Sequence, residues 1–233
     1  MKLSNKINAI AGSQTVAFTT LIQQLQQEGR QIIDLAVGEP QLDTPAAVIE
    51  ATQKALAAQK TRYSPVNGLS RLRAQLAAQF DEGERDNILI TNGSKQALYM
   101  IFQVICDLAD EVIVPVPYWV SFVEQVKLAG GRPVPVATRN HRLNINAIEQ
   151  ALSPRTKAIL INSPNNPSGA VYPIDDLHSI ARLAADHNLF IVADEAYNAF
   201  VYDGGVCASM FDIKMVRDRL IVTRSFSKSY SMT

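Results

Sequence analysis

The feature that most constrains the fold is a regular alternation from Asn87 onwards, where short runs rich in β-branched residues alternate with stretches of helical spacing. The runs predicted to be strands are residues 88–91, 111–115, 133–137, 158–162, 190–194 and 220–224. The stretches predicted to be helices are residues 95–108, 118–129, 146–152 and 175–187, with one short turn after Ser209. Repeated strand, helical crossover and strand predict an α/β fold: a mostly parallel sheet with helices on both faces.

The part of the chain before this alternation begins with an expected helix. Apolar side chains at helical spacing indicate a helix over residues 16–27 that ends at Gly29. An apolar run then indicates a short strand over residues 32–37. The turn that follows contains Gly38, where the missing side chain lets a ligand approach the backbone.

Another helix is predicted to begin at Thr44 and Pro45, with the threonine as N-cap and the proline at the first helical position. It is expected to end near Lys60. Its inner apolar stripe is predicted to consist of Val48, Ile49, Thr52, Ala55 and Leu56. A loop containing Tyr63 separates it from an arginine-rich helix predicted over residues 69–80.

Composition excludes several classes of function. Lysines plus arginines and aspartates plus glutamates number 22 each, so the net charge is zero and a nucleic-acid partner is not expected. Residues 1–18 contain no apolar core of signal-peptide length, and no later apolar run approaches the ~20 residues of a membrane span. We therefore expect a soluble, cytoplasmic protein without a membrane partner. The 3 histidines offer no metal cluster, so no metal site is expected.

Chemically distinctive residues follow several predicted strands. Ligands of parallel sheets bind beyond the carboxyl ends of the strands, so these residues are candidates for one site. Gly93 follows a predicted strand and opens a helix, where free N–H groups and the helix dipole favour an anion. Lys228 follows the last predicted strand among small hydroxyl residues, where lost solvation lowers the pKa of an ammonium and makes it a nucleophile.

Two further candidates carry an open alternative each. Asp194 ends a buried predicted strand, so its anion requires a cationic partner unless it is solvated at the strand end. Glu195 is the poorer candidate, since the strand pleat directs it to the opposite face. Trp119 lies just past a predicted strand, where an aromatic ring either joins the core or supports a flat ligand, and Tyr118 is the alternative.

Four short motifs occur together in this chain. They are Gly93-Ser94-Lys95, Asn166-Pro167-Ser168-Gly169, Asp194-Glu195-Ala196-Tyr197 and Ser225-x-Ser227-Lys228. In order and spacing they resemble the class I/II aminotransferases of the pyridoxal-phosphate fold type I family, and most closely their bacterial aspartate aminotransferase-like branch. The resemblance implies the cofactor pyridoxal 5'-phosphate and the large domain of that fold.

The resemblance also implies roles in the chemistry of the cofactor. Lys228 would hold it as a Schiff base and then move the substrate α-proton as general base and acid. Asp194 would keep the pyridine nitrogen protonated. Tyr197 and Asn166 would donate to the phenolic oxygen, and Trp119 would lie over the ring.

Other residues are assigned to the phosphate and the substrate by the same resemblance. Gly93, Ser94 and Lys95 would cradle the phosphate, with the Ser225 hydroxyl as a further donor. The Gly38 backbone would meet the substrate carboxylate, with Trp119 and Asn166 also in contact with the substrate. Tyr63 resembles the tyrosine that reaches the phosphate of the neighbouring subunit, which implies a homodimer.

The resemblance covers essentially the whole chain and implies its domain division. Residues 1–40 would form an N-terminal arm and a segment of the small domain, and residues 41–233 the cofactor-binding large domain. After Met232 and Thr233 the family normally continues with a phosphate-binding arginine, a further strand and a C-terminal domain. We therefore expect a large domain that is incomplete at its C-terminal end, with the C-terminal domain absent.

The implied activity is transfer of an α-amino group from an amino acid to a 2-oxo acid such as 2-oxoglutarate, with the amino donor left open. One alternative is a C–S or C–C lyase of the same fold, which would release pyruvate or ammonia without an acceptor. Another alternative is a truncated, non-catalytic remnant that binds cofactor or a partner subunit.

Overall fold

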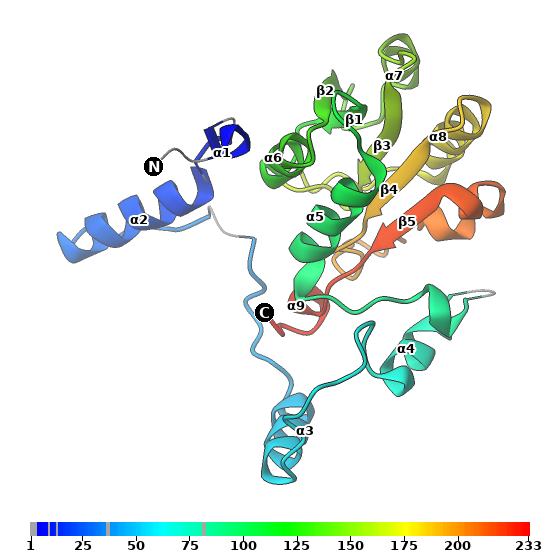
Figure 1. The fold of residues 1–233 in the computed structure, drawn as a ribbon. Coiled ribbons are helices and arrows are strands. Elements are labelled where there is room, and N and C mark those ends of the chain that lie inside the picture. The colour runs from blue at the N-terminus through cyan, green and yellow to red at the C-terminus, as the bar shows by residue number, and fades with distance from the viewer. Residues whose placement is uncertain (1–3, 9, 13, 36–37, 81–82) are drawn as a thin grey trace.

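The computed structural model describes residues 4–8, 10–12, 14–35, 38–80 and 83–233. Its centre is a 5-stranded sheet with the strand order β2-β1-β3-β4-β5, in which every neighbouring pair is parallel (Figure 1). The strands are β1 (Glu111–Val116), β2 (Arg132–Ala137), β3 (Thr156–Asn162), β4 (Phe190–Asp194) and β5 (Leu220–Thr223). The predicted α/β fold with a parallel sheet is confirmed.

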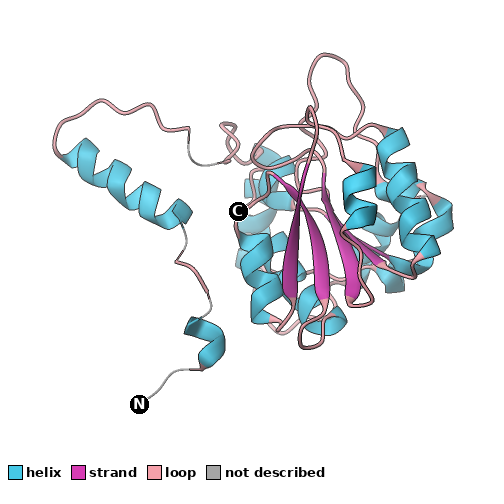
Figure 2. Cartoon of the chain, turned by 90° about the horizontal axis from the view of Figure 1, so that it is seen from above, coloured by secondary structure: helices cyan, strands magenta, loops and turns pink. Residues whose placement is uncertain are grey.

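Helices cover both faces of this sheet (Figure 2). Because side chains alternate along a strand, neighbouring residues enter different cores. In β4, Ile191 packs in the core that contains α7 (Ile145–Gln150) and α8 (Ile174–Asp186). Val192 packs in the core formed with α5 (Gly93–Ile105) and α6 (Ser121–Leu128). Near-continuous apolar runs are therefore what the inner strands β1, β3 and β4 require, since both of their faces are buried.

The remaining elements surround this layered unit. Between β4 and β5 lie two 3₁₀ helices, η2 (Met210–Asp212) and η3 (Lys214–Arg219), and α9 (Phe226–Ser229) follows β5. Before the sheet come α1 (Asn5–Asn8), α2 (Gln14–Gln27), α3 (Ala46–Ala57), α4 (Ser70–Ala77) and η1 (Arg85–Asn87). In Figures 1 and 2, α1 and α2 lie to one side of the sheet, and the division at residue 40 stays a prediction. Among the described helices, none is long and apolar enough to cross a membrane.

Two predicted strands are wrong over the residues that the structure describes. Residues 32–35 form no strand, and Ile33 and Leu35 are 89% and 90% exposed; residues 36 and 37 lie outside the described part. Residues 88–91 also form no strand, although Ile88 is extended. The Arg73 Nε donates to the Ile88 carbonyl at 2.7 Å. Both segments have strand-forming residues, but a strand also needs a paired neighbour, and β-propensity alone does not supply one.

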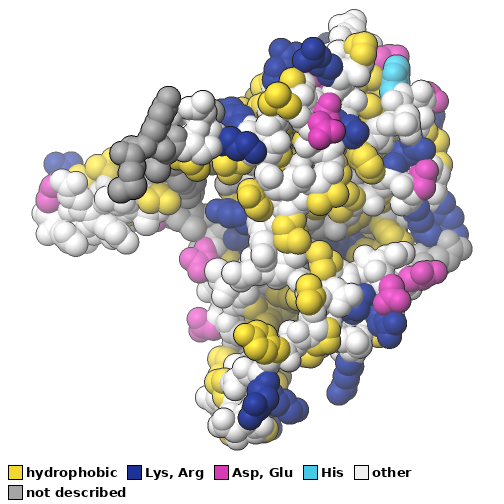
Figure 3. Space-filling view, viewed as in Figure 1, with side chains coloured by type: hydrophobic (Ala, Val, Ile, Leu, Met, Phe, Trp, Pro, Cys, Tyr) yellow, Lys and Arg dark blue, Asp and Glu magenta, His cyan; other side chains and the backbone are white. Residues whose placement is uncertain are grey.

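The expectations for α3 are also corrected. The helix begins at Ala46, and the Thr44 hydroxyl donates to the Ser231 carbonyl instead of capping it. No residue of α3 is buried, and Ile49 and Leu56 of the expected inner stripe are exposed. Apolar side chains are visible on the surface around α3 (Figure 3). Helical spacing predicted the helix correctly but not what its apolar face contacts, because that depends on the position of other elements.

Candidate active site

Three predicted site residues meet beside the C-terminal ends of β4 and β5. The Lys228 Nζ donates to the Gly38 carbonyl at 2.7 Å, and the Tyr197 hydroxyl donates to the same carbonyl at 3.3 Å. The Lys228 Nζ also lies 5.5 Å from the centroid of the Tyr197 ring. A Cβ atom on Gly38 would lie 2.8 Å from the Tyr197 hydroxyl oxygen, so a larger residue at this position would displace that hydroxyl. The fold thus joins the segment before α3 to the end of the sheet.

The position of Lys228 changes its chemistry. The residue lies on α9, directly after the short loop that follows β5. Partial burial lowers the pKa of its ammonium group because water is removed, and Glu39 opposes this effect. A lower pKa makes more of the neutral amine available near neutral pH. Lys228 therefore has the property that a nucleophile or a general base requires.

Asp194 is the buried carboxylate of the site. It is 4% exposed at the end of β4, and its Oδ1 accepts from the Thr223 hydroxyl at 3.1 Å and the Ala196 N–H at 3.2 Å. Burial raises its pKa to about 6, against the two hydrogen bonds, which lower it. In the described part of the chain no cation pairs with Asp194. No side chain in this part of the chain is therefore the expected cationic partner. The carboxylate is suited to bind a cationic ligand instead.

Glu195 lies on the other side of the sheet. Its Oε1 accepts from the Ser209 hydroxyl at 2.7 Å and the Met210 N–H at 3.0 Å. Its Oε2 accepts from the Arg224 Nε at 3.0 Å and Nη2 at 2.9 Å. These contacts give Glu195 a structural role that joins β4, η2 and the end of β5.

The start of α5 has the features of an anion site. Gly93 has φ +76°, and a Cβ on it would meet nothing within 4 Å, so the space beside its backbone is open. The Gly93 N–H donates to the Thr91 carbonyl at 2.9 Å. No side chain caps the helix, which leaves the N–H groups of Ser94 and Lys95 available. The Gln125 Nε2 donates to the Lys95 carbonyl at 2.9 Å and ties the turn to α6. The Ser225 hydroxyl accepts from the Ser227 N–H at 3.2 Å, which leaves its own proton free to donate.

Trp119 and Asn166 complete the group of predicted residues. Trp119 packs edge-on against Phe122 at 5.3 Å, and the Lys95 Nζ lies 5.0 Å from the Trp119 ring centroid. The Asn166 N–H donates to the Asn162 Oδ1 at 2.7 Å. The Asn162 Nδ2 in turn donates to the Asp194 carbonyl at 3.0 Å. Asn162 therefore joins the turn of Asn166 to the strand of Asp194.

The sequence reasoning missed Asn162 and Thr223 as parts of the site. Asn162 ends the predicted strand 158–162 and Thr223 is the last residue but one of the predicted strand 220–224, and a polar side chain at such a position was the available signal. Tyr63, in contrast, was predicted, but its side chain is fully exposed and the structure does not join it to the other site residues.

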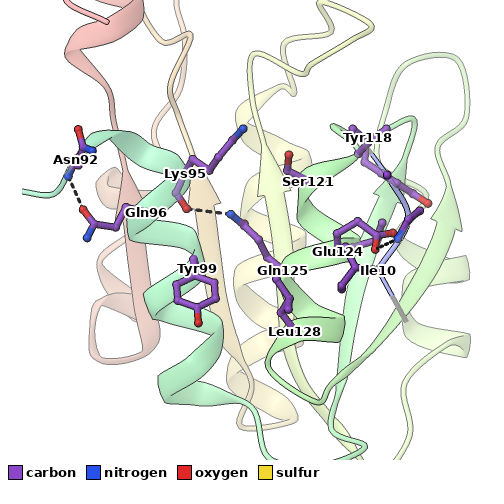
Figure 4. A pocket seen from close by; sticks show the side chains of 14 residues that line it. Ile10, Asn92, Lys95, Gln96, Tyr99, Tyr118, Ser121, Glu124, Gln125 and Leu128 are labelled. Atoms are coloured by element: carbon purple, nitrogen blue, oxygen red, sulfur yellow. Dashed lines mark hydrogen bonds between the residues drawn. The ribbon is translucent and has the colours of Figure 1, made fainter. Parts of the chain in front are cut away.

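A cleft of about 830 Å³ lies between α5 and α6 (Figure 4). Residues 10–12 also border it, and the Ala11 N–H donates to the Glu124 Oε2 at 3.0 Å. Of the predicted site residues, Lys95 lines it, as does Tyr118, the alternative to Trp119. Lys228, Tyr197 and Asp194 are not among the residues that line this cleft.

Comparison with known proteins shows the family of this chain. The sequence model of the family "Aminotransferase class I and II" matches residues 30–233. The chain belongs to this family. Class I and II aminotransferases similar to it include the aspartate aminotransferase of Bacillus subtilis (strain 168), 37% identical over 100% of this chain and 62% of that protein. The aspartate/prephenate aminotransferase of Thermus thermophilus is 43% identical over 87% of this chain and 54% of its own length.

Solved structures of aminotransferases share the fold. The aspartate aminotransferase of Thermotoga maritima has a TM-score of 0.94 and 36% identity, covering 99% of this chain and 64% of that structure. The Thermus thermophilus aspartate aminotransferase with maleate has a TM-score of 0.93 and 38% identity, and the match covers 100% of this chain and 62% of that structure. The chain thus spans about 62% of the length of such relatives.

Proposed function

We propose that this chain contributes the cofactor site of a pyridoxal-phosphate-dependent amino acid aminotransferase. The observation that carries the proposal is the convergence of Lys228, Tyr197 and Gly38 beside the end of the sheet that also holds Asp194. By likeness to the aspartate aminotransferases named above, aspartate is the proposed amino donor and 2-oxoglutarate the proposed acceptor.

The chain's residues fit pyridoxal 5'-phosphate in charge and in donor type. Asp194 is a buried carboxylate with no described cation beside it, as a protonated pyridine nitrogen requires. The open first turn of α5 and the Ser225 hydroxyl offer donors for the phosphate dianion. Tyr197 and Asn166 offer donors for the ring oxygen, and Trp119 offers a flat apolar face. When bound, the cofactor withdraws electrons from the α-carbon of the substrate through its ring.

Lys228 is the proposed covalent anchor and proton carrier. As a free amine, its Nζ would accept the α-proton of the amino acid as general base and would then release that proton again as general acid, which restores the free amine. The lowered pKa favours this role, because the neutral amine is the form that attacks a carbonyl and accepts a proton. Gly38 would hold the Nζ in place through its carbonyl, and Tyr197 would restrict the same space from the other side.

The proposal includes a cytoplasmic homodimer. The Tyr63 side chain is fully exposed in the single chain, so its hydroxyl is available to a second subunit. We propose that it reaches the phosphate bound by that neighbouring subunit. Cross-linking of Tyr63→Cys protein through the introduced thiol would report the contact, and an unchanged monomer would count against it.

Covalent labelling tests the function. The purified protein is mixed with pyridoxal 5'-phosphate, its absorbance is recorded, and borohydride reduction is followed by peptide mass mapping. The pyridoxyl group should be found on Lys228, and Lys228→Ala should lose the label while Lys95→Ala keeps it. A label on Lys95 instead would overturn the assignment. Release of ammonia or pyruvate without a 2-oxo acid acceptor would indicate the lyase alternative.

A further inference from the structure

We propose that Thr223 is a positioning residue whose hydroxyl sets the orientation and charge state of the Asp194 carboxylate. Its hydroxyl holds one carboxylate oxygen, so that the other oxygen is left for the ligand. The part of this inference that concerns the cofactor rests on the proposed function. The effect of Thr223 on the carboxylate itself does not depend on the proposed function, because it involves only the side chains of Thr223 and Asp194.

The register of the sheet brings the two residues together. Asp194 ends β4, Thr223 ends β5, and their Cα atoms are partners in the parallel ladder. Partners in adjacent strands direct their side chains to the same face, at neighbouring positions. The pairing continues one step further, since the Glu195 N–H donates to the Thr223 carbonyl at 2.8 Å. The alignment of these side chains is therefore fixed by backbone hydrogen bonds on both strands.

The contact is confined to one oxygen of the carboxylate. The Thr223 Oγ1 lies 3.1 Å from Oδ1, and the Ala196 N–H donates to the same atom at 3.2 Å. No described residue donates to Oδ2. With Oδ1 held by two donors, rotation of the carboxylate is restrained and Oδ2 remains as the free acceptor.

The surroundings make this hydroxyl important for the charge of Asp194. Thr223 and Asp194 are 5% and 4% exposed, so water contributes little. Burial and the neighbouring Glu195 both raise the pKa of Asp194, whereas Thr223 and the Ala196 N–H lower it. Glu195 itself pairs with Arg224. Burial, and to a smaller extent Asp194, raises the pKa of the nearby Tyr197. On the β3 side the neighbour is the neutral Asn162 amide, which binds the backbone carbonyl of Asp194. Thr223 is thus one of two groups that favour the ionised carboxylate.

Direct titration of the carboxylate tests the inference without any cofactor. Protein labelled with ¹³C at the aspartate carboxyl carbons is titrated by NMR, and Asp194→Asn identifies the Asp194 signal. Thr223→Val keeps the shape and removes the donor, so the pKa of Asp194 should rise by about one pH unit. Thr223→Ser keeps the donor and is the matched control, which should titrate close to the unchanged protein.

The pKa of Asp194 in these variants distinguishes a positioning role of Thr223 from a purely structural one. An Asp194 pKa in Thr223→Val equal to that of the unchanged protein would overturn the inference, as would equal shifts in the valine and serine variants. A purely structural role would lower the midpoint of thermal unfolding and leave the pKa in place. If the valine variant does not fold, Thr223→Ala removes the same donor without added volume and carries the same test.

A second readout connects Thr223 with the cofactor. The dissociation constant for pyridoxal 5'-phosphate should rise several-fold in Thr223→Val and stay nearly unchanged in Thr223→Ser. Absence of cofactor binding by the unchanged protein would contradict the proposed function. The NMR titration would still decide the role of Thr223, so the two failures are distinguishable.

Discussion

At the residue scale, Asp194 should make stability depend on pH. Its pKa is about 6 in the folded chain, above the value of about 3.9 for an aspartate in an unfolded chain. The folded state therefore holds this proton to higher pH. The stabilisation is fully present below about pH 4 and is lost as pH rises through 6, a change of about 3 kcal/mol. Urea unfolding between pH 4 and 7 should show this decline, and Asp194→Asn should lack it.

The control for this prediction is Asp218→Asn. Asp218 is exposed, and the hydrogen bond from Arg219 lowers the pKa of its carboxyl. The contribution of Asp218 to stability is therefore present above the pKa of an unfolded aspartate and is lost as pH falls. This pH dependence is opposite to that expected for Asp194. If Asp194→Asn and the unchanged protein lost stability equally between pH 4 and 7, the decline would come from another group.

At the element scale, Arg224 connects the end of β5 to distant segments. It binds Glu195 of the β4 end, and its guanidinium carbon lies 4.6 Å from the centroid of the Phe80 ring. Glu195 is 3% exposed at its side chain and Arg224 31%. Arg224→Met would leave a buried carboxylate without its cation. We expect a loss of about 2 to 4 kcal/mol in the free energy of unfolding, less than for a fully buried pair.

Lys54→Ala is the matched control for Arg224→Met. Lys54 forms an ion pair with Glu50 on α3 at 3.7 Å, with side chains 81% and 65% exposed. Solvent screens this pair, so its loss should change the free energy of unfolding by less than about 0.5 kcal/mol. Equal losses in the two variants, measured by chemical denaturation, would show that the Arg224 pair is no stronger than a surface pair.

At the scale of the whole molecule, the described elements should differ in local stability. The helices α3 and α8 contain 12 and 13 residues, but α3 buries none of them whereas α8 buries six. Isolated helices of this length are only marginally stable in water, so they depend on tertiary packing. The helix α3 lacks the packing that stabilises α8. Amide hydrogen exchange followed by mass spectrometry should be orders of magnitude faster in α3. Equal protection of the α3 and α8 amides from exchange in dilute protein would contradict this prediction. Protection of α3 that increases with protein concentration would indicate that a second copy of the chain packs on α3.

The sequence alone determined the alternation of strands and helices and the positions of the chemically distinctive residues. The predicted strand over residues 190–194 matches β4, and the other strands of the sheet agree within two residues at each end. Hydrophobic periodicity is a local property of a buried strand or helix, so it can be read without the rest of the chain. The positions of Asp194 and Lys228 were predictable for the same reason, since they lie at the end of β4 and shortly after β5, whereas Gly93 begins α5 and follows no strand. Their roles stay proposals.

Only the tertiary structure decided which segments meet. Residues 88–91 have the composition of a strand but lack a paired neighbour, and Thr44 donates its hydrogen bond to Ser231 instead of capping α3. The contact of Lys228 with Gly38 joins positions 190 residues apart, and that of Thr223 with Asp194 depends on the register between two strands. Such contacts arise from the relative placement of distant segments. No local pattern contains that information, because the free energy that aligns the strands comes from both cores of the sheet together.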